Sequence, residues 1–477
     1  MVFSSLEFLF VFLPIVLIGY VVLKVPGISK LRLSNAWLLA ASLLFYYLGA
    51  PKYLKLLLFI ILIAYVAGLV EGMVENKPLR IATLTAAVAA MIYFMAYYKY
   101  YDFMVENINL FFHKSLEVKN LILPVGISFF VFQAISYVVD VYRGEKHIKN
   151  PIDMALYISF FPQLIAGPIV RYHDIRKYLD SEYRKLDYEK MSDGAWRFCV
   201  GLCKKVLLAN NLGILADQVF NGDSIATYSI CYTWLGALAY TLQIYYDFSG
   251  YSDMAIGLGR LFGFEFQENF NYPYVAKSVK DFWRRWHISL SQFFRDYVYI
   301  PLGGNRCKKS RWIFNMMVVW LLTGMWHGAA WTYILWGVLY GVLILTESLF
   351  RKDSDSKHPV TSVLMRLYTA FVVIMLWVIF RSNTLFDAVC FMKNMIGLGS
   401  KVFLDQGTLF QMKNYWVLLL LSMVLATPIL KVLDEKLDGW KNKLFHVVEM
   451  LLLTMLTVAS ASYIYMGSYN PFLYFMF

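Results

Sequence analysis

Long runs without a charged side chain dominate the hydrophobic pattern of this chain. Counting Asp, Glu, Lys and Arg as charged, ten stretches of at least 15 residues carry none: 8–23, 33–51, 56–70, 81–98, 120–139, 154–170, 224–246, 312–346, 414–430 and 450–477. A bilayer core about 30 Å thick needs roughly 20 apolar residues of helix, so the shorter stretches must rely on tilt, flanking residues or partial insertion. A soluble core helix could explain one such stretch but not ten, and the pattern predicts a polytopic membrane protein.

Helices are expected for these spans, because a lipid-exposed backbone must satisfy its own hydrogen bonds. A β-barrel needs short alternating segments, whereas residues 417–421 read Val-Leu-Leu-Leu-Leu. The first residues, Met-Val-Phe-Ser-Ser-Leu-Glu, lack the positive region of a secretory signal, so we expect the first hydrophobic stretch to be retained as a helix. No fixed-period repeat or long linker divides the chain, and we predict one membrane domain over residues 1–477.

Two segments depart from simple spans. The first, 312–346, has 35 residues without a charge. As one helix it would be about 52 Å long, so we expect a break or bend at 323–331, where His327 lies. The second, 247–311, contains a basic, tryptophan-rich part with His287 at the edge of its aromatic face. There we expect an amphipathic helix at the membrane interface or at the floor of a cavity. Its apolar side chains recur at three- and four-residue intervals: Trp283, Trp286, Leu290, Phe293, Phe294 and Tyr297.

Composition and charge refine this picture. The chain is 59% hydrophobic and only 16% charged, whereas soluble domains are about 25% charged. Of the formal charge of +12, residues 171–205 contribute +3 (nine Lys and Arg, six Asp and Glu) and residues 277–311 contribute +7 (nine and two). Basic loops stay on the cytoplasmic side of a membrane, so we predict that both segments are cytoplasmic. The positive charge of both segments could also serve only to orient the protein in the membrane, with no role in binding. Nucleic acid is not an expected partner, because these charges lie between spans.

His327 and His287 are the two histidines in apolar or aromatic surroundings. An ionisable residue inside a membrane is costly and therefore indicates a functional site. Esterifying a hydroxyl requires removal of its proton, and a neutral imidazole does this near pH 7. We expect His327 to be that general base; if Gly328, Ala329 and Ala330 open a helix, their N–H groups would bind the oxyanion. The alternatives are a hydrogen bond from His327 that joins two helices and an interfacial contact for His287.

Two carboxylates, Asp247 and Asp253, lie in a polar cluster after the seventh stretch. They could orient a histidine or bind a cationic group. They could equally cap helices or pair with Arg260, Arg284 or Arg285. No zinc-ligand spacing, phosphate loop or dinucleotide fingerprint is present, so no metal site is predicted. The five cysteines imply no disulfide framework.

A series of specific motifs runs through the chain. In order they are LPVGISFF (123–130), SYVVDVYR (136–143), FPQLIAGPI (161–169), DFSGYSDMA (247–255), NFNYPY (269–274), DFWRRWHISLS (281–291), YIPLGGNR (299–306), WHGAAW (326–331) and NPFLYF (470–475). Together they resemble the membrane-bound O-acyltransferases, and specifically their bacterial alginate O-acetyltransferase branch.

The resemblance implies an all-α membrane fold, a ring of about eleven transmembrane helices with re-entrant and interfacial helices around a central tunnel for a cytoplasmic acyl donor. His327 corresponds to the catalytic histidine of the family and His287 to its second histidine. The guanidinium groups of Arg284 and Arg285 would attract donor phosphates. The side chains that we expect to bind donor or substrate are Arg284, Arg285, Trp283, Trp286, Asp247, Asp253, Asn271 and Trp326.

The implied activity is that of a membrane O-acetyltransferase in the bacterial cytoplasmic membrane. It would move an acetyl group from a cytoplasmic thioester to hydroxyls of an extracytoplasmic polysaccharide or to a relay partner protein, with acetyl-CoA as donor and no bound cofactor. Teichoic-acid D-alanylation proteins share GYSD and WHG elements, so D-alanyl transfer is an alternative, although YIPLGGNR favours the polysaccharide branch. A non-catalytic scaffold and a proton-coupled transporter with Asp247, Asp253 and His327 as relay are further alternatives; a transporter often shows two similar halves, and none is visible here.

Overall fold

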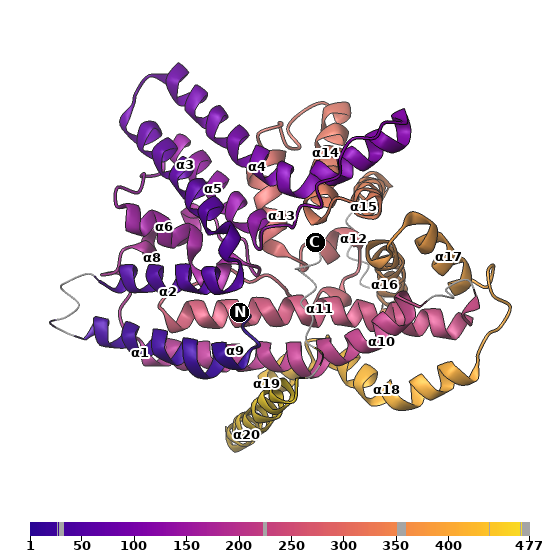
Figure 1. Cartoon of the computed structure of the whole chain (residues 1–477). Coiled ribbons are helices and arrows are strands. Elements are labelled where there is room, and N and C mark those ends of the chain that lie inside the picture. The colour runs from indigo at the N-terminus through magenta and orange to yellow at the C-terminus, as the bar shows by residue number, and fades with distance from the viewer. Residues whose placement is uncertain are drawn as a thin grey trace. The chain divides into compact units, whose positions relative to one another are not determined.

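The computed structural model describes residues 1–25, 27, 33–222, 227–350, 359–437, 439–467 and 469. Every regular element among them is a helix (Figure 1). Seven of these helices are long and apolar enough to cross a membrane, and two shorter apolar helices cover Phe8–Lys24 and Ile127–Tyr142. The predicted all-α membrane architecture is therefore confirmed. The ring of about eleven helices and its tunnel stay predictions of the resemblance.

The first of two compact units comprises Met1–Phe198 and Ser252–Glu268. In it α3 packs against α4 and α5, and α2 packs against α6. Helix α4 begins after Asn76, whose side chain accepts a hydrogen bond from the Leu79 N–H, an N-cap that satisfies one of the free donors of the first turn. The helices are η1 (Phe8–Phe12), α1 (Leu13–Lys24), α2 (Ser34–Gly49), η3 (Pro51–Tyr53), α3 (Leu54–Met73), α4 (Lys77–Phe112), α5 (Ile127–Tyr142), α6 (Pro151–Ser159), α7 (Phe161–Leu164), α8 (Tyr172–Leu179), most of α9 (Tyr188–Cys203) and the last turns of α11 (Ile230–Leu261).

The second unit comprises Cys199–Tyr251 and Asn269–Phe477. In it α14 packs along α15, and α12 contacts both α15 and α16. Besides most of α11, the helices are η4 (Lys204–Ala209), α10 (Asn210–Phe220), η6 (Pro273–Val275), α12 (Val279–Trp283), α13 (Ile288–Phe294), η7 (Arg295–Tyr299), α14 (Lys309–His327), α15 (Trp331–Phe350), α16 (Pro359–Arg381), α17 (Leu385–Met395), α18 (Gln406–Leu425), α19 (Ile429–Lys436) and α20 (Gly439–Tyr465).

The predicted break in the long uncharged run is confirmed, since α14 ends at His327 and α15 begins at Trp331. The two helices then lie against each other closely. A Cβ atom at Gly324 would collide with the Tyr333 carbonyl oxygen, and one at Gly337 with the Trp320 carbonyl oxygen. Glycine at both positions therefore lets the two backbones approach.

The single amphipathic helix expected from Trp283 to Tyr297 is wrong. The segment breaks after α12, and His287, at φ 43°, stands in the left-handed region before α13 begins. A non-glycine residue rarely adopts that conformation, and the spacing of apolar residues does not predict it. Of the apolar positions expected on the face of that helix, all but one are buried: Trp283, Trp286, Leu290, Phe293 and Phe294 are buried, and Tyr297 is half-buried.

One candidate span was not among the charge-free stretches of the sequence. Helices α9, η4 and α10 join into Tyr188–Phe220, although this segment contains Lys204 and Lys205 and overlaps the basic stretch that we predicted as cytoplasmic. The C-terminal NPFLYF motif lies outside the described residues. The single domain over 1–477 stays a prediction, because two compact units are compatible with one domain or with two.

Candidate active site

His327 is the last residue of α14 and is buried, with 6% of its surface exposed. Its ring is enclosed by aromatic rings from three helices, with centroid distances of 5.0 Å to Trp326, 5.1 Å to Trp336 and 5.2 Å to Phe380. The imidazole therefore faces protein side chains at the break between two helices.

The chain leaves α14 through Gly328, which is extended at φ −177°. A Cβ atom there would meet the ring of Tyr333, so glycine lets the chain turn beside that ring. Residues Gly328, Ala329 and Ala330 precede α15, which begins at Trp331. The suggestion that these three residues open a helix and direct its first N–H groups at an oxyanion is therefore wrong; the first turn of α15 follows them.

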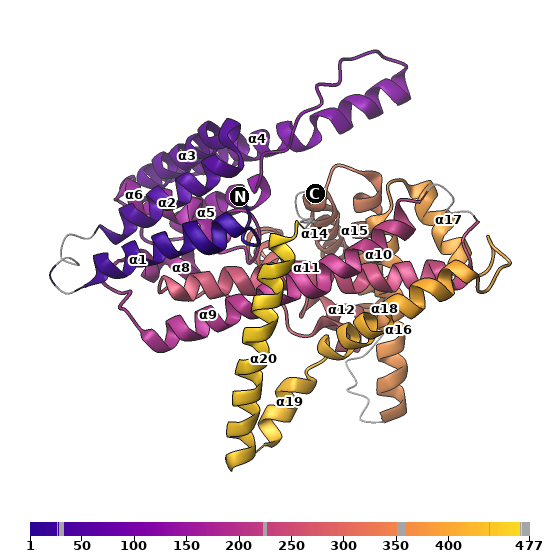
Figure 2. The ribbon, with the colours of Figure 1, turned by 60° about the horizontal axis from the view of Figure 1, so that its bottom comes forward.

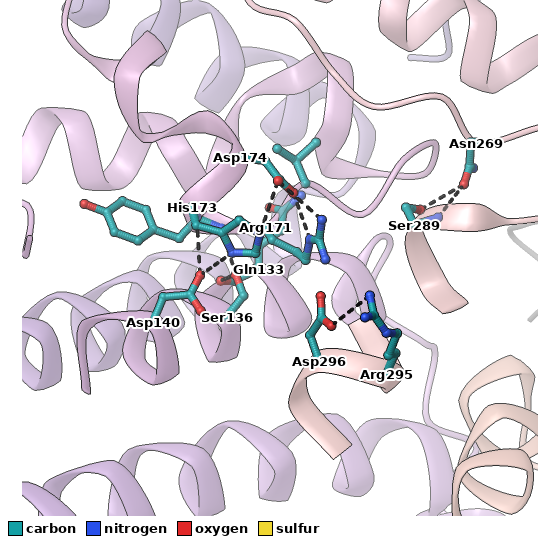
Figure 3. A network of polar contacts seen from close by, with 12 residues as sticks. Gln133, Ser136, Asp140, Arg171, His173, Asp174, Asn269, Ser289, Arg295 and Asp296 are labelled. Atoms are coloured by element: carbon teal, nitrogen blue, oxygen red, sulfur yellow. Dashed lines mark hydrogen bonds and ion pairs between the residues drawn. The ribbon is translucent and has the colours of Figure 1, made fainter. Parts of the chain in front are cut away.

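His287 is fully buried and bonded to Asn269. The distance from His287 Nδ1 to Asn269 Oδ1 is 3.1 Å. The same oxygen accepts hydrogen bonds from the Ser289 N–H at 3.3 Å and the Ser289 hydroxyl at 2.9 Å (Figure 3). Because a backbone N–H can only donate, it identifies the amide oxygen, and Nδ1 of His287 must carry the proton. A neutral His287 thus has Nε2 as its acceptor nitrogen.

Electrostatics keeps His287 neutral. Burial lowers the pKa of His287 well below its ordinary value, and proximity to His327 lowers it further. The two histidines also share a neighbour, since the Trp326 ring lies 5.7 Å from the His287 ring and 5.0 Å from the His327 ring. The structure therefore brings His287, Trp326 and His327 into one cluster.

Trp283 and Trp286 are packed into the aromatic core of the second unit. Trp283 lies edge-on to Trp320 at 4.8 Å and Tyr340 at 5.0 Å, and Trp286 lies 4.9 Å from Trp377. Trp283 also lines a cavity, described next, whereas the contacts of Trp286 are those of a core residue.

A cavity of about 1050 Å³ lies within the second unit. Four cationic side chains line it, and no carboxylate does among the described residues: Lys280, Arg284, Arg295 and Arg306. Its wall includes Thr323, which stands four residues before His327 and so on the same face of α14. Arg284 is exposed at this cavity, but Arg285 is not part of its wall. The Arg285 Nε instead donates to Asp281 at 2.9 Å.

The two carboxylates have cationic partners that the sequence did not suggest. Asp247 is buried and pairs with the buried Lys205 of η4. Asp253 belongs to the first unit and pairs with Arg197 at 2.9 Å. Pairing was one of the open alternatives for both carboxylates, but the expected arginines were others. Among the described residues, no group of three or more His, Cys, Asp and Glu side chains could hold a metal ion.

Asn269 is the residue of this site that the sequence reasoning missed. The same motif had suggested Asn271, which is exposed and whose main-chain N–H donates to the Arg285 carbonyl oxygen at 2.9 Å. Asn271 thus supports the loop, while Asn269 bonds the histidine. The motif NFNYPY contains both asparagines, two residues apart. Only the folded loop shows which of the two bonds His287.

A second polar cluster, in the first unit, surrounds His173 of α8. His173 Nδ1 lies 3.0 Å from Asp140 Oδ2 and His173 Nε2 lies 3.2 Å from Asp174 Oδ1, and Arg171 also bonds Asp174 (Figure 3). These hydrogen bonds, to Asp140 first, raise the pKa of His173 to about 9. The charged histidine links α5 to α8, which is a structural role.

Comparison with known proteins places these features in a family. The model of the membrane-bound O-acyltransferase family matches residues 57–389. The chain is 38% identical to a probable alginate O-acetylase of Pseudomonas putida over the full length of both proteins. It is 36% identical to a peptidoglycan O-acetyltransferase of Helicobacter pylori, over 83% of this chain and 80% of that one.

A more distant relative is a teichoic acid D-alanyltransferase of Bacillus subtilis, which is 33% identical over 49% of this chain and 61% of that protein. The family match covers more than half of the chain and includes both histidines, and the alginate O-acetylase similarity extends over all of it. This chain therefore belongs to the membrane-bound O-acyltransferase family, and it is an enzyme of its alginate O-acetylase-like branch.

Proposed function

We propose that this enzyme is a membrane O-acetyltransferase of the bacterial cytoplasmic membrane. It takes an acetyl group from a cytoplasmic thioester, acetyl-CoA, and passes it to hydroxyls of an extracytoplasmic polysaccharide or to a relay partner protein. The support is the family together with relatives named for O-acetylation of alginate and of peptidoglycan.

In the proposed reaction His327 acts as general base. Its neutral imidazole takes the proton of the attacking hydroxyl while the hydroxyl oxygen forms an ester bond with the acetyl carbonyl carbon. The carbon–sulfur bond of the donor then breaks, and the leaving thiolate recovers a proton. The observation that carries the proposal is the place of His327, buried at the break between α14 and α15 in one aromatic cluster with His287.

His287 completes the proposed site beside His327. With Nδ1 held by Asn269, its neutral ring is fixed in one tautomer and one orientation, and we assign it to orienting the acceptor hydroxyl. Asn269 is then a positioning residue, because it acts through the histidine and not on the substrate.

The basic cavity is the proposed donor site. Coenzyme A carries several phosphate charges, and the four cations that line the cavity complement them. Arg284 is assigned to these phosphates. Arg285 is assigned to the loop through its bond to Asp281, which revises the expectation that both arginines bind the donor.

D-alanyl transfer to teichoic acid is the second candidate, and the similarity to a D-alanyltransferase favours it. That similarity covers about half of this chain, whereas the O-acetylase relatives match 81% or more of it. Acetyl transfer is therefore preferred.

The test replaces His327 by alanine and measures acetate released from surface glycans of cells that depend on this enzyme. A general base contributes about 10² to 10⁴-fold to the rate. The rate of acetylation should therefore fall at least about 100-fold while the protein still inserts stably. His446→Ala is the matched control, since His446 is exposed in α20 and should leave acetylation unchanged. Normal acetylation by stably inserted His327→Ala protein would remove the assignment.

A further inference from the structure

The first unit contains a smaller cavity, of about 190 Å³, that the proposed reaction does not use. Three tyrosines contribute to its wall: Tyr20, Tyr178 and Tyr183. Cations outnumber carboxylates among its ionisable side chains, which are Arg184, Lys185, Lys190, Arg260, Asp187 and Glu265.

Both carboxylates of this cavity are already engaged. Glu265 accepts hydrogen bonds from Lys190 Nζ at 2.5 Å and from the Tyr178 hydroxyl at 3.1 Å. Asp187 accepts the main-chain N–H of Lys190 at 3.2 Å and so caps the start of α9. Lys190 pairs with Glu265, so Arg184, Lys185 and Arg260 stand against the single charge of Asp187, and the lining keeps a net charge of +2.

Arg184 is the central group of the cavity, with only 2% of its surface exposed. Its guanidinium donates to the Phe262 carbonyl oxygen at 3.3 Å and to the Asn35 side chain, and it lies over the Phe264 ring at 4.3 Å. Within the described parts of the chain, no carboxylate forms an ion pair with it, and its Nε has no acceptor. The charges of Asp153 and Asp180 act on it only from beyond ion-pair distance. A buried guanidinium without a directly paired anion is costly, which points to an anionic ligand.

Three long helices end at this cavity. Tyr20 is in the last turns of α1, which ends at Lys24; α9 begins at Tyr188; and α11 ends at Leu261. In Figure 2 these three helix ends lie on the same side of the first unit. Tyrosines and cations at the ends of apolar helices are typical of the headgroup level of a membrane, and basic pockets between helices there bind lipid phosphates.

We propose that this cavity binds a phosphate group carried by an anionic membrane lipid. Guanidinium groups donate well-directed hydrogen bonds to phosphate oxygens, and Arg184 and Arg260 supply two of them. The volume is below the roughly 300 to 1000 Å³ of pockets for drug-sized ligands, which suits a headgroup phosphate and excludes a nucleotide. The inference is independent of the proposed acetyl transfer.

The experiment measures the melting temperature of the purified full chain in detergent during titration with phosphatidylglycerol, phosphatidylcholine or inorganic phosphate. Phosphatidylglycerol should raise it saturably, and phosphatidylcholine, which carries no net charge, should not. Additional stabilisation by inorganic phosphate would support recognition of the phosphate group itself. Stabilisation by inorganic phosphate without any by phosphatidylglycerol would overturn the lipid as its source.

Two variants locate the effect. Arg184→Gln removes the buried guanidinium, and Arg260→Gln removes a partly exposed one whose loss leaves the bonds to Asn35 and Phe262 intact. Each should weaken the apparent affinity for phosphatidylglycerol about tenfold, as expected for one lost charge-assisted hydrogen bond. Lys149→Gln makes the same charge change at an exposed position of the same unit and should bind as the wild type does. Equal affinities of Arg260→Gln and Lys149→Gln proteins would overturn the proposal.

Discussion

At the residue scale, one amide oxygen decides the chemical state of His287. Asn269 Oδ1 accepts from a main-chain N–H and from the imidazole, so the protonated nitrogen of the ring is determined by the backbone. His327, one aromatic ring away, has its surroundings decided by packing. The two histidines therefore differ in how they are held, and substitutions around them should have different consequences.

Replacing Asn269 by alanine should lower kcat about 10 to 100-fold, because the imidazole loses the bond that sets its tautomer. Asn269→Asp keeps an acceptor and should retain more activity. Its negative charge favours the protonated imidazole and raises the pKa of His287, so the acidic limb of the kcat/KM profile should move to higher pH.

These pH profiles separate positioning from folding. Asn442→Ala, in α20, makes the same loss of an amide outside the cluster and should leave the profile in place. If both Asn269 variants lose activity equally, with an unmoved acidic limb, Asn269 has no role through the histidine.

The neighbouring arginines provide a second matched comparison. Arg284→Gln should raise the KM for acetyl-CoA about tenfold, because one charge-assisted contact to phosphate is lost. Arg285→Gln should change the KM little, since its guanidinium bonds Asp281 outside the cavity wall. Steady-state kinetics with varied acetyl-CoA measure both. Equal effects of the two substitutions would contradict the assignment of Arg284 alone to the donor.

At the scale of elements, a buried ion pair joins two helices of the second unit. Lys205 in η4 and Asp247 in α11 are 3% and 2% exposed. Removing one partner of such a pair leaves the other charge buried and uncompensated, which is strongly destabilising. The pair explains how Lys205 can be buried inside the candidate span Tyr188–Phe220.

Lys205→Met or Asp247→Asn should each destabilise the protein by about 3 to 5 kcal/mol, measured as loss of folded protein in detergent on heating. The double variant Lys205→Met with Asp247→Leu should recover most of that loss, because no charge stays buried. The exposed pair Lys431 and Glu435, 3.9 Å apart, is the control, and its loss should change little. A folded double variant without acetyl transfer would show that Asp247 has a further role in the reaction.

At the scale of the whole molecule, basic and apolar segments alternate along the sequence, but in the structure the basic segments are not confined to loops between spans. The basic segment 171–205 extends from α8 into α9 and η4, so its last residues belong to a candidate span. The segment 277–311 forms α12, α13, η7 and the first residues of α14, and four of its nine Lys and Arg side chains line the proposed donor cavity. The Lys and Arg residues of a basic segment that indicates membrane orientation can therefore also line a cavity or form a buried ion pair.

Much of the architecture followed from the sequence because its causes are local. A run of uncharged residues that exceeds the membrane thickness must break, and small residues around His327 mark where. Stretches without charges were found in the sequence, while Tyr188–Phe220 was missed because it carries charged residues. One of them, the buried Lys205, pairs with a carboxylate 42 positions away. The helix expected from Trp283 to Tyr297 failed because periodicity reports which side chains are buried and not the left-handed turn at His287.

The sequence by itself determined that this protein is a helical membrane protein, because composition depends on neighbouring residues only. Its motifs showed the resemblance to an acyltransferase family and singled out two histidines as candidates for the site. The tertiary structure decided that Asn269 and not Asn271 bonds His287, that Arg284 and not Arg285 faces the cavity, and that Arg184 is buried without a directly paired carboxylate. These outcomes depend on side chains far apart in the chain, and their distances exist only once the chain has folded.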